Sequence, residues 1–169
     1  MSSSWDFDPV DRFTAGALGE PGHRVFYIQA AGRGELVTLL AEKEQISALA
    51  QTVARLLALL PEDDEDEIDP SDVDLIEPVL QEWRAGSMAL DYDEVADRLV
   101  FVIEEALAED DENDPATLRV AATRAQSRAM SEHAAEVVAS GRPQCRICGQ
   151  PMDPEGHNCP GLNGHKEIH

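Results

Sequence analysis

Val25-Phe26-Tyr27-Ile28 recurs 75 positions later as Val100-Phe101-Val102-Ile103. β-Branched and aromatic residues in such runs predict strands. Further strands are predicted from alternation or from similar composition at residues 5–8, 35–40 and 117–122. The repeated stretch therefore lies in the middle of two separate groups of strands.

A helical pattern follows each group of strands. The first apolar face comes from Ile46, Leu49, Val53, Leu56, Leu57 and Leu60, and Pro61 ends that helix. The second comes from Met130, Ala134, Val137 and Val138, and Gly141 and Pro143 end it. The sequence thus predicts an amphipathic helix after each set of strands.

The predicted fold class is α+β, with two repeated units of antiparallel strands followed by one helix. The shared pattern aromatic-x-Ala-Gly, at residues 13–16 and 83–86, supports an internal duplication. We expect each helix to cover the sheet of its own unit and the units to be related by a pseudo-two-fold axis. A groove between the units would be the natural binding surface.

Four segments are expected along the chain. They are a first unit at 1–61, an acidic linker at 62–78, a second unit at 79–141, and a small cysteine-containing knuckle with its tail at 142–169. Residues 62–67 are six consecutive acids, which repel one another and favour a solvated linker. The alternative is a functional acidic surface, either a nucleic-acid mimic or a dock for a basic partner.

Composition limits the function. The 169 residues are 43% hydrophobic and carry a net charge of −21, which disfavours nucleic acid and anionic membranes. The sequence has no apolar run long enough to cross a bilayer and no secretory signal at its start. Three cysteines, an odd number, argue against a disulfide framework. These features predict a cytoplasmic protein.

All three cysteines lie in one C-terminal stretch, Cys145-Arg-Ile-Cys148-Gly followed by His157-Asn-Cys159-Pro. Thiolate and imidazole are the ligands that zinc prefers. Cys145, Cys148, His157 and Cys159 are therefore the predicted ligands of one structural Zn²⁺, because four protein ligands leave no open position. His165 is the alternative to His157, and a redox role for the CxxC pair is the alternative to metal binding.

The motifs at both ends of the chain resemble those of an actinobacterial family of unknown function. At the N-terminal end these residues are Phe7-Asp8-Pro9, Arg12-Phe13, Ala15-Gly16, Gly19-Glu20-Pro21-Gly22, Arg24, Phe26-Tyr27 and Gln29. At the C-terminal end they are Gly141-Arg142-Pro143, Cys145, Cys148-Gly149, Pro151, Asp153-Pro154, Gly156-His157, Cys159-Pro160 and Asn163-Gly164.

The resemblance covers nearly the whole chain, with a weaker middle, and implies no established activity. Its gene setting, beside thiol-cofactor biosynthesis and kinase-like and phosphatase-like proteins, implies a pathway but no role. His165 stands where the family more often has an aromatic residue, which supports His157 as the ligand.

No common catalytic motif is present, so the sequence favours a non-catalytic binding or adaptor protein whose partner is another protein or a small anionic ligand. The alternatives are a module for single-stranded nucleic acid, or an enzyme or accessory acting on a small anionic metabolite. Aromatic residues are only 5% of the chain, which disfavours the nucleic-acid module. Asp91, Asp93 and Glu94 fit a hairpin turn better than a catalytic carboxylate pair.

Two basic-x-Gln pairs open the predicted helices and form a possible anion site. The pairs are Lys43 with Gln45, and Arg124 with Gln126. Backbone amides at a helix N-terminus attract anions. The alternative, which we favour, is that the basic side chains form salt bridges with the many acids nearby.

Overall fold

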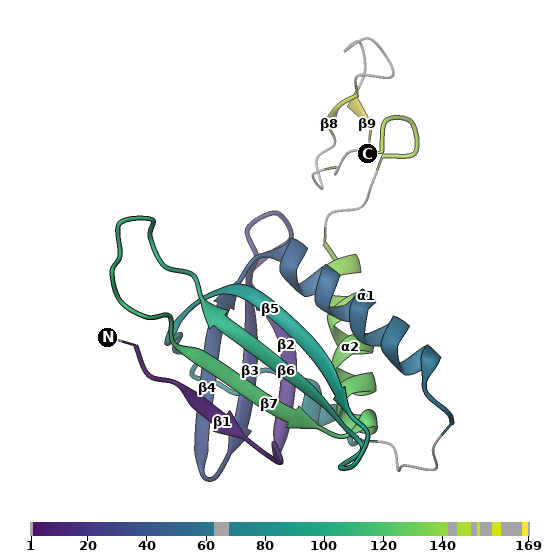
Figure 1. The fold of residues 1–169 in the computed structure, drawn as a ribbon. Helices are drawn as coiled ribbons and strands as arrows, with labels where there is room; N and C mark the ends of the chain where they lie inside the picture. The colour runs from purple at the N-terminus through teal and green to yellow at the C-terminus, as the bar shows by residue number, and fades with distance from the viewer. Residues whose placement is uncertain are drawn as a thin grey trace.

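A computed structural model of the chain describes residues 2–62, 68–141, 145–149, 152, 157–159 and 167–168, the residues at 157–158 and 167–168 as backbone only. The main element is a seven-stranded sheet with the order β1-β7-β6-β5-β4-β3-β2 (Figure 1). Its strands are β1 (Trp5–Phe7), β2 (Arg12–Leu18), β3 (Val25–Gly32), β4 (Glu35–Ala41), β5 (Trp83–Asp93), β6 (Arg98–Glu105) and β7 (Thr117–Ala122). A separate short pair joins β8 (His157–Asn158) to β9 (Glu167–Ile168).

Three antiparallel strands are followed by one helix, twice. The first half is β2-β3-β4 with α1 (Lys43–Leu59), and the second is β5-β6-β7 with α2 (Arg124–Ala139). β4 and β5 pair in parallel and join the halves into one sheet. The predicted α+β class, with two strand-helix units, is therefore confirmed.

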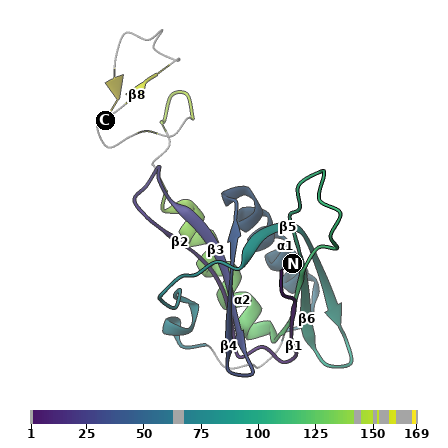
Figure 2. The ribbon, with the colours of Figure 1, turned by 90° about the vertical axis from the view of Figure 1, so that its left-hand side faces the viewer.

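The sheet curls so that its halves face each other across one core (Figures 1 and 2). The rings of Phe13 from β2 and Phe101 from β6 lie 4.8 Å apart between centroids. β1 pairs in parallel with β7, and the amides of Val10 and Asp11 then donate to Ala121 of β7 and Ala31 of β3. These bonds connect the two edges of the curled sheet. Phe7 of β1 is then buried, at 1% exposure.

The helices do not pack as expected. The two helices pack chiefly on each other. α2 also packs along β2 of the first half, with only a small contact to β6 of its own half, and α1 makes a small contact with β5 of the second half. The cause is the strand order. α1 starts at the end of β4, and β4 lies next to β5 of the second half. α2 starts at the end of β7, and the segment just before β2 bonds to β7. Each helix therefore crosses to the other half of the sheet.

The connection from α1 to β5 contains the acidic run, of which residues 63–67 lie outside the described part. The 3-10 helix η1 (Pro70–Val73) follows and contacts β2. The chain then crosses the outer side of β3 and reaches β4, where the Glu82 amide donates to Thr38. No described helix combines the length and the apolar character needed to cross a membrane.

Candidate functional site

The C-terminal cysteines lie on a tight turn of the backbone. The amide of Gly149 donates to the carbonyl of Cys145 over 2.9 Å, and the amide of Ile147 points at the Cys145 sulfur over 3.4 Å. Gly149 has φ +74°, a conformation that glycine adopts without steric cost. The turn thus directs the amides of Ile147 and Cys148 toward the Cys145 sulfur.

Three sulfur atoms gather at this turn. The Sγ atoms of Cys145, Cys148 and Cys159 lie within 4.8 Å of one another, and those of Cys145 and Cys159 are 3.7 Å apart. A disulfide requires about 2.05 Å, so Cys145 and Cys159 are not joined by one. In a tetrahedron with metal–sulfur bonds of about 2.3 Å, two sulfurs are roughly 3.8 Å apart. The spacing fits a shared metal ion, and the three cysteines could hold one.

The electrostatics of the turn favour a thiolate. The amides of Cys148 and Ile147, with a smaller contribution from the other two thiols, lower the pKa of Cys145 from its ordinary value. Burial opposes this lowering of the pKa, since Cys145 and Cys159 are only 3% and 0% exposed, but the hydrogen bonds outweigh it at Cys145. Since the thiolate is the form that binds metal, the site is prepared for a cation that prefers sulfur.

The fourth predicted ligand is not placed. His157 belongs to β8, where its backbone pairs with Ile168, but its side chain and the whole of His165 lie outside the described part. The choice between these histidines stays a prediction.

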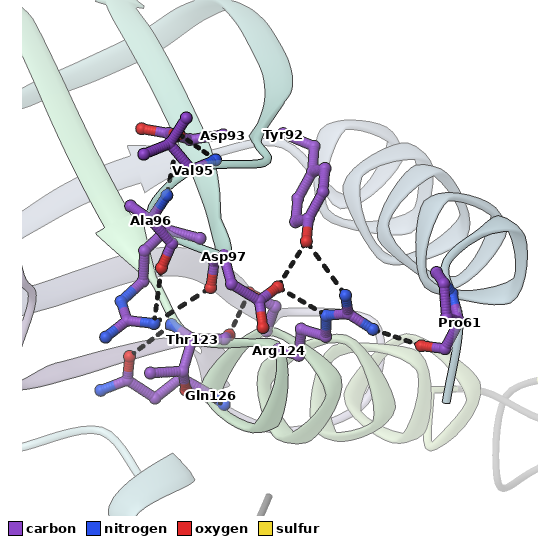
Figure 3. Close-up of polar contacts among 11 residues, drawn as sticks. Pro61, Tyr92, Asp93, Val95, Ala96, Asp97, Thr123, Arg124 and Gln126 are labelled. Carbon is purple, nitrogen blue, oxygen red and sulfur yellow. Dashed lines mark hydrogen bonds and ion pairs between the residues drawn. The ribbon is translucent and has the colours of Figure 1, made fainter. Parts of the chain in front are cut away.

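A second polar cluster lies where the β5–β6 hairpin meets α2 (Figure 3). The Arg124 guanidinium donates to Asp97 over 2.7 Å, to the Tyr92 hydroxyl over 3.0 Å, and to the Pro61 carbonyl. The Tyr92 hydroxyl also donates to Asp97 over 2.5 Å. The cluster therefore connects the end of α1, the hairpin and the start of α2.

The charges in this cluster stabilise one another. Hydrogen bonds from Tyr92 and Arg124 lower the pKa of Asp97, and the bond to Asp97 raises the pKa of Tyr92. The bonds to Asp97 and Tyr92 raise the pKa of Arg124. Arg124 is 8% exposed, and the carboxylate of Asp97 balances its buried positive charge. This pattern is typical of a structural clamp.

The chain matches over residues 5–159 the family described as "Protein of unknown function (DUF3090)". The chain belongs to this family. No curated protein and no solved structure matches it. The family description assigns no activity, so the function has to be argued from the residues.

In this family member the two glutamines of the predicted anion site occupy equivalent structural positions. Gln45 and Gln126 are each the third residue of a helix and close a capping box with Glu42 and Thr123 respectively. Each amide group then bonds two consecutive main-chain carbonyls that are distant in the sequence. The Gln45 amide donates to Ala85 and Gly86, and that of Gln126 to Val10 and Asp11.

The basic members of these pairs differ from each other. Arg124 forms the expected salt bridge, with Asp97, whereas Lys43 is exposed at the start of α1. Anion binding by the four residues stays a prediction.

The hairpin turn predicted at Asp91, Asp93 and Glu94 is confirmed, because Asp93 accepts bonds from the amides of Val95 and Ala96. Asp97 is the site residue that the sequence did not reveal. It has φ +53°, a left-handed conformation unusual for a non-glycine residue. A partial signal was available, since Asp is enriched in that conformation at turns.

Proposed function

We propose that this protein is a non-catalytic binding or adaptor protein with a structural zinc site. Cys145, Cys148, Cys159 and His157 would be the ligands of one Zn²⁺. The observation that supports the proposal is the convergence of three cysteine sulfurs within 4.8 Å of one another. Thiolate-rich sites favour zinc over harder cations such as Mg²⁺ and Ca²⁺.

A site with four protein ligands has no open coordination position, which favours a structural role over catalysis. The segment 142–169 is too short to build an apolar core, so metal binding would supply much of its folding free energy. A module of this kind holds loops rigidly and can present them to a partner. Three cysteines used for a metal site rather than for disulfides agree with a reducing compartment, which supports the cytoplasm as the location.

The body of the protein supports binding better than chemistry. Its main cluster of shifted pKa values, at Tyr92, Asp97 and Arg124, is explained by mutual hydrogen bonds. The net charge of −21 opposes a nucleic-acid role. The partner we favour is another protein, with a small anionic ligand as the alternative.

We further infer that the body arose by duplication, with its units at 1–61 and 79–141 separated by the linker 62–78. Gln126 and Gln45 are each the third residue of a helix, and each donates to two consecutive main-chain carbonyls far away in the sequence, at Val10 and Asp11 and at Ala85 and Gly86 respectively. Chance similarity of short strand patterns does not explain this exchange of contacts. A two-fold relation between the halves does.

Metal analysis of the purified full chain tests the zinc site. We expect about one zinc per chain, retained by His165→Ala and lost on dialysis by Cys159→Ser and His157→Ala. Less than about half an equivalent in the parent chain would contradict the proposal. Loss of zinc in His165→Ala with retention in His157→Ala would reverse the assignment of the fourth ligand.

A further inference from the structure

The outer side of β2 and β3 is covered by a short piece of the α1–β5 connection. We call residues 71–76 the strap. Most of its residues are exposed, and Ile76 is 37% exposed, so little apolar surface holds it in place. What holds it is a set of side chains on the sheet.

These side chains bond the main chain of the strap. Arg12 donates to the carbonyls of Ser71, over 2.7 Å, and of Asp74. Thr14 donates to the carbonyl of Val73 over 2.5 Å. Because the contacts are to backbone groups, other sequences in the same conformation, a 3-10 turn that becomes extended at Asp74, would satisfy them.

One of these contacts, between Gln29 and Ile76, is a pair of reciprocal hydrogen bonds. The side-chain amide of Gln29 donates to the Ile76 carbonyl over 3.0 Å and accepts from the Ile76 amide over 2.8 Å. The same amide group donates to Thr38 over 3.1 Å, which fixes its orientation. Thr14, Gln29 and Thr38 are all at most 2% exposed. The strap therefore supplies hydrogen-bond partners to the polar groups that it covers.

At one position of the strap the sheet contacts the side chain rather than the backbone. Leu75 lies against Gly16, where an added Cβ would come within 2.8 Å of the leucine Cγ. The missing side chain of Gly16 therefore leaves a notch for one branched apolar residue. Main-chain bonds with a single apolar notch are the pattern of a peptide-docking groove.

The strap fits this groove incompletely. Arg12 Nε is buried and has no hydrogen-bond acceptor among the described residues. Asp72 approaches the other side of the guanidinium, at 3.4 Å from Nη1. A carboxylate that engaged Nε together with a terminal nitrogen would form the stronger bidentate pair. A peptide that placed such a carboxylate there would satisfy a donor that the strap leaves without an acceptor.

We propose that this groove docks a segment of a partner protein in the conformation of the strap, a 3-10 turn followed by extended chain, and that the strap is a built-in competitor for it. The segment would carry an acidic side chain at Arg12 and a leucine or isoleucine at Gly16. The strap and its flanks, residues 68–78, contain four acids and no basic residue within a chain of net charge −21. The negative charge of the rest of the chain repels the acids of the strap and so weakens its binding to the groove. A partner segment with fewer acids would be repelled less. The inference rests on the proposed binding function and names the partner class.

The test measures binding of a fluorescent peptide of residues 68–78 to the full chain by anisotropy. A variant with residues 71–76 replaced by alternating glycine and serine has no strap to compete. We expect this variant to bind the peptide at least about tenfold more tightly than the wild type. Adding Gly16→Ala to it should weaken binding about tenfold, because the new methyl group fills the notch. A peptide with Asp72→Glu, which reaches further, should bind more tightly than one with Asp72→Ala.

Circular dichroism and a thermal melt establish that the variants are folded. If the strap-replaced variant does not fold, Leu75→Ala in the full chain supplies the comparison, and it should bind the peptide more tightly than the wild type. A folded variant that binds no more tightly than the wild type would overturn the proposal. Dimers that form by exchange of straps would also overturn it, since the occupant would be a second copy. Zinc content of the same samples reports on the metal site separately, so the two proposals can fail independently.

Discussion

Gln126→Met is the change that best tests how the two halves of the protein are held together. The Gln126 side chain accepts from the Thr123 amide over 2.9 Å and donates to the Val10 carbonyl over 3.0 Å. A longer bond of 3.4 Å reaches Asp11. Methionine has nearly the same length and helix propensity, so the change removes these bonds and little else.

The expected loss follows from counting those bonds. Two good hydrogen bonds contribute about 0.5–1.5 kcal/mol each, and the carbonyl of Val10 loses its side-chain donor. We therefore expect Gln126→Met to lower the free energy of unfolding by about 2 kcal/mol. For a protein of this size that corresponds to a melting temperature lower by about 4–8 °C. Gln45→Met should cost about the same, because Gln45 makes bonds of 3.0 and 2.9 Å to Ala85 and Gly86.

Gln51→Met is the matched control, since Gln51 is exposed on α1 and bonds only to neighbours within its own helix among the described residues. Its unfolding free energy should stay within about 0.5 kcal/mol of the parent. Urea denaturation followed by circular dichroism gives all three values. If Gln126→Met matched Gln51→Met, the idea that these glutamines fix the two halves would be refuted. If millimolar phosphate stabilised the parent but neither glutamine variant, the anion site would be the better explanation.

Three further results are expected. Cys145 in the metal-free protein should react with iodoacetamide at lower pH than in the unfolded chain, because neighbouring amides lower its pKa; equal pH profiles, followed by mass spectrometry, would contradict this. Asp97→Asn should flatten the pH dependence of stability near pH 4. The lowered pKa of Asp97 gives stability above its ordinary value of 3.8, which is lost as the pH falls through the folded-state pKa, and a melting series that declined as in the parent would refute the clamp. Gly32→Ala should lower the unfolding free energy by about 1–3 kcal/mol, because its Cβ would lie 2.8 Å from a ring atom of the buried Phe7; unchanged denaturation would argue against the docking of β1.

Local structure was predictable from the sequence because it depends on local patterns. The strand at Thr117–Ala122 and the helix opening at Arg124 are found at the predicted residues. Composition and periodicity act within a few residues, and Pro61 marks a helix end by its own chemistry. The packing partner of each helix was not predictable in this way, since it depends on β4 pairing with β5 and on β1 pairing with β7, contacts between distant residues.

The candidate sites also differ in whether their residues are close together or far apart in the sequence. The gathering of Cys145, Cys148 and Cys159 could be predicted because thiols at metal-ligand spacing have few other uses in a chain without disulfides. The partnership of Arg124 with Asp97 could not, because 27 residues separate them and only the curled sheet brings them together. The strap is a similar case: an acidic linker gives no sign of the groove beneath it.

Polar contacts across the folded body follow a common physical rule. Gln45, Gln126 and Arg124 each bond main-chain carbonyls that are distant in sequence, and Arg12, Thr14 and Gln29 do the same to the strap. The apolar core is non-directional and would tolerate small shifts between the halves. Hydrogen bonds to fixed carbonyls are directional, so they set the register in which the core packs. A side chain that hydrogen-bonds main-chain groups also tolerates changes in the side chains of the segment that it binds. The means by which the fold fixes its own segments is therefore the one that a peptide-binding protein would need for its partners.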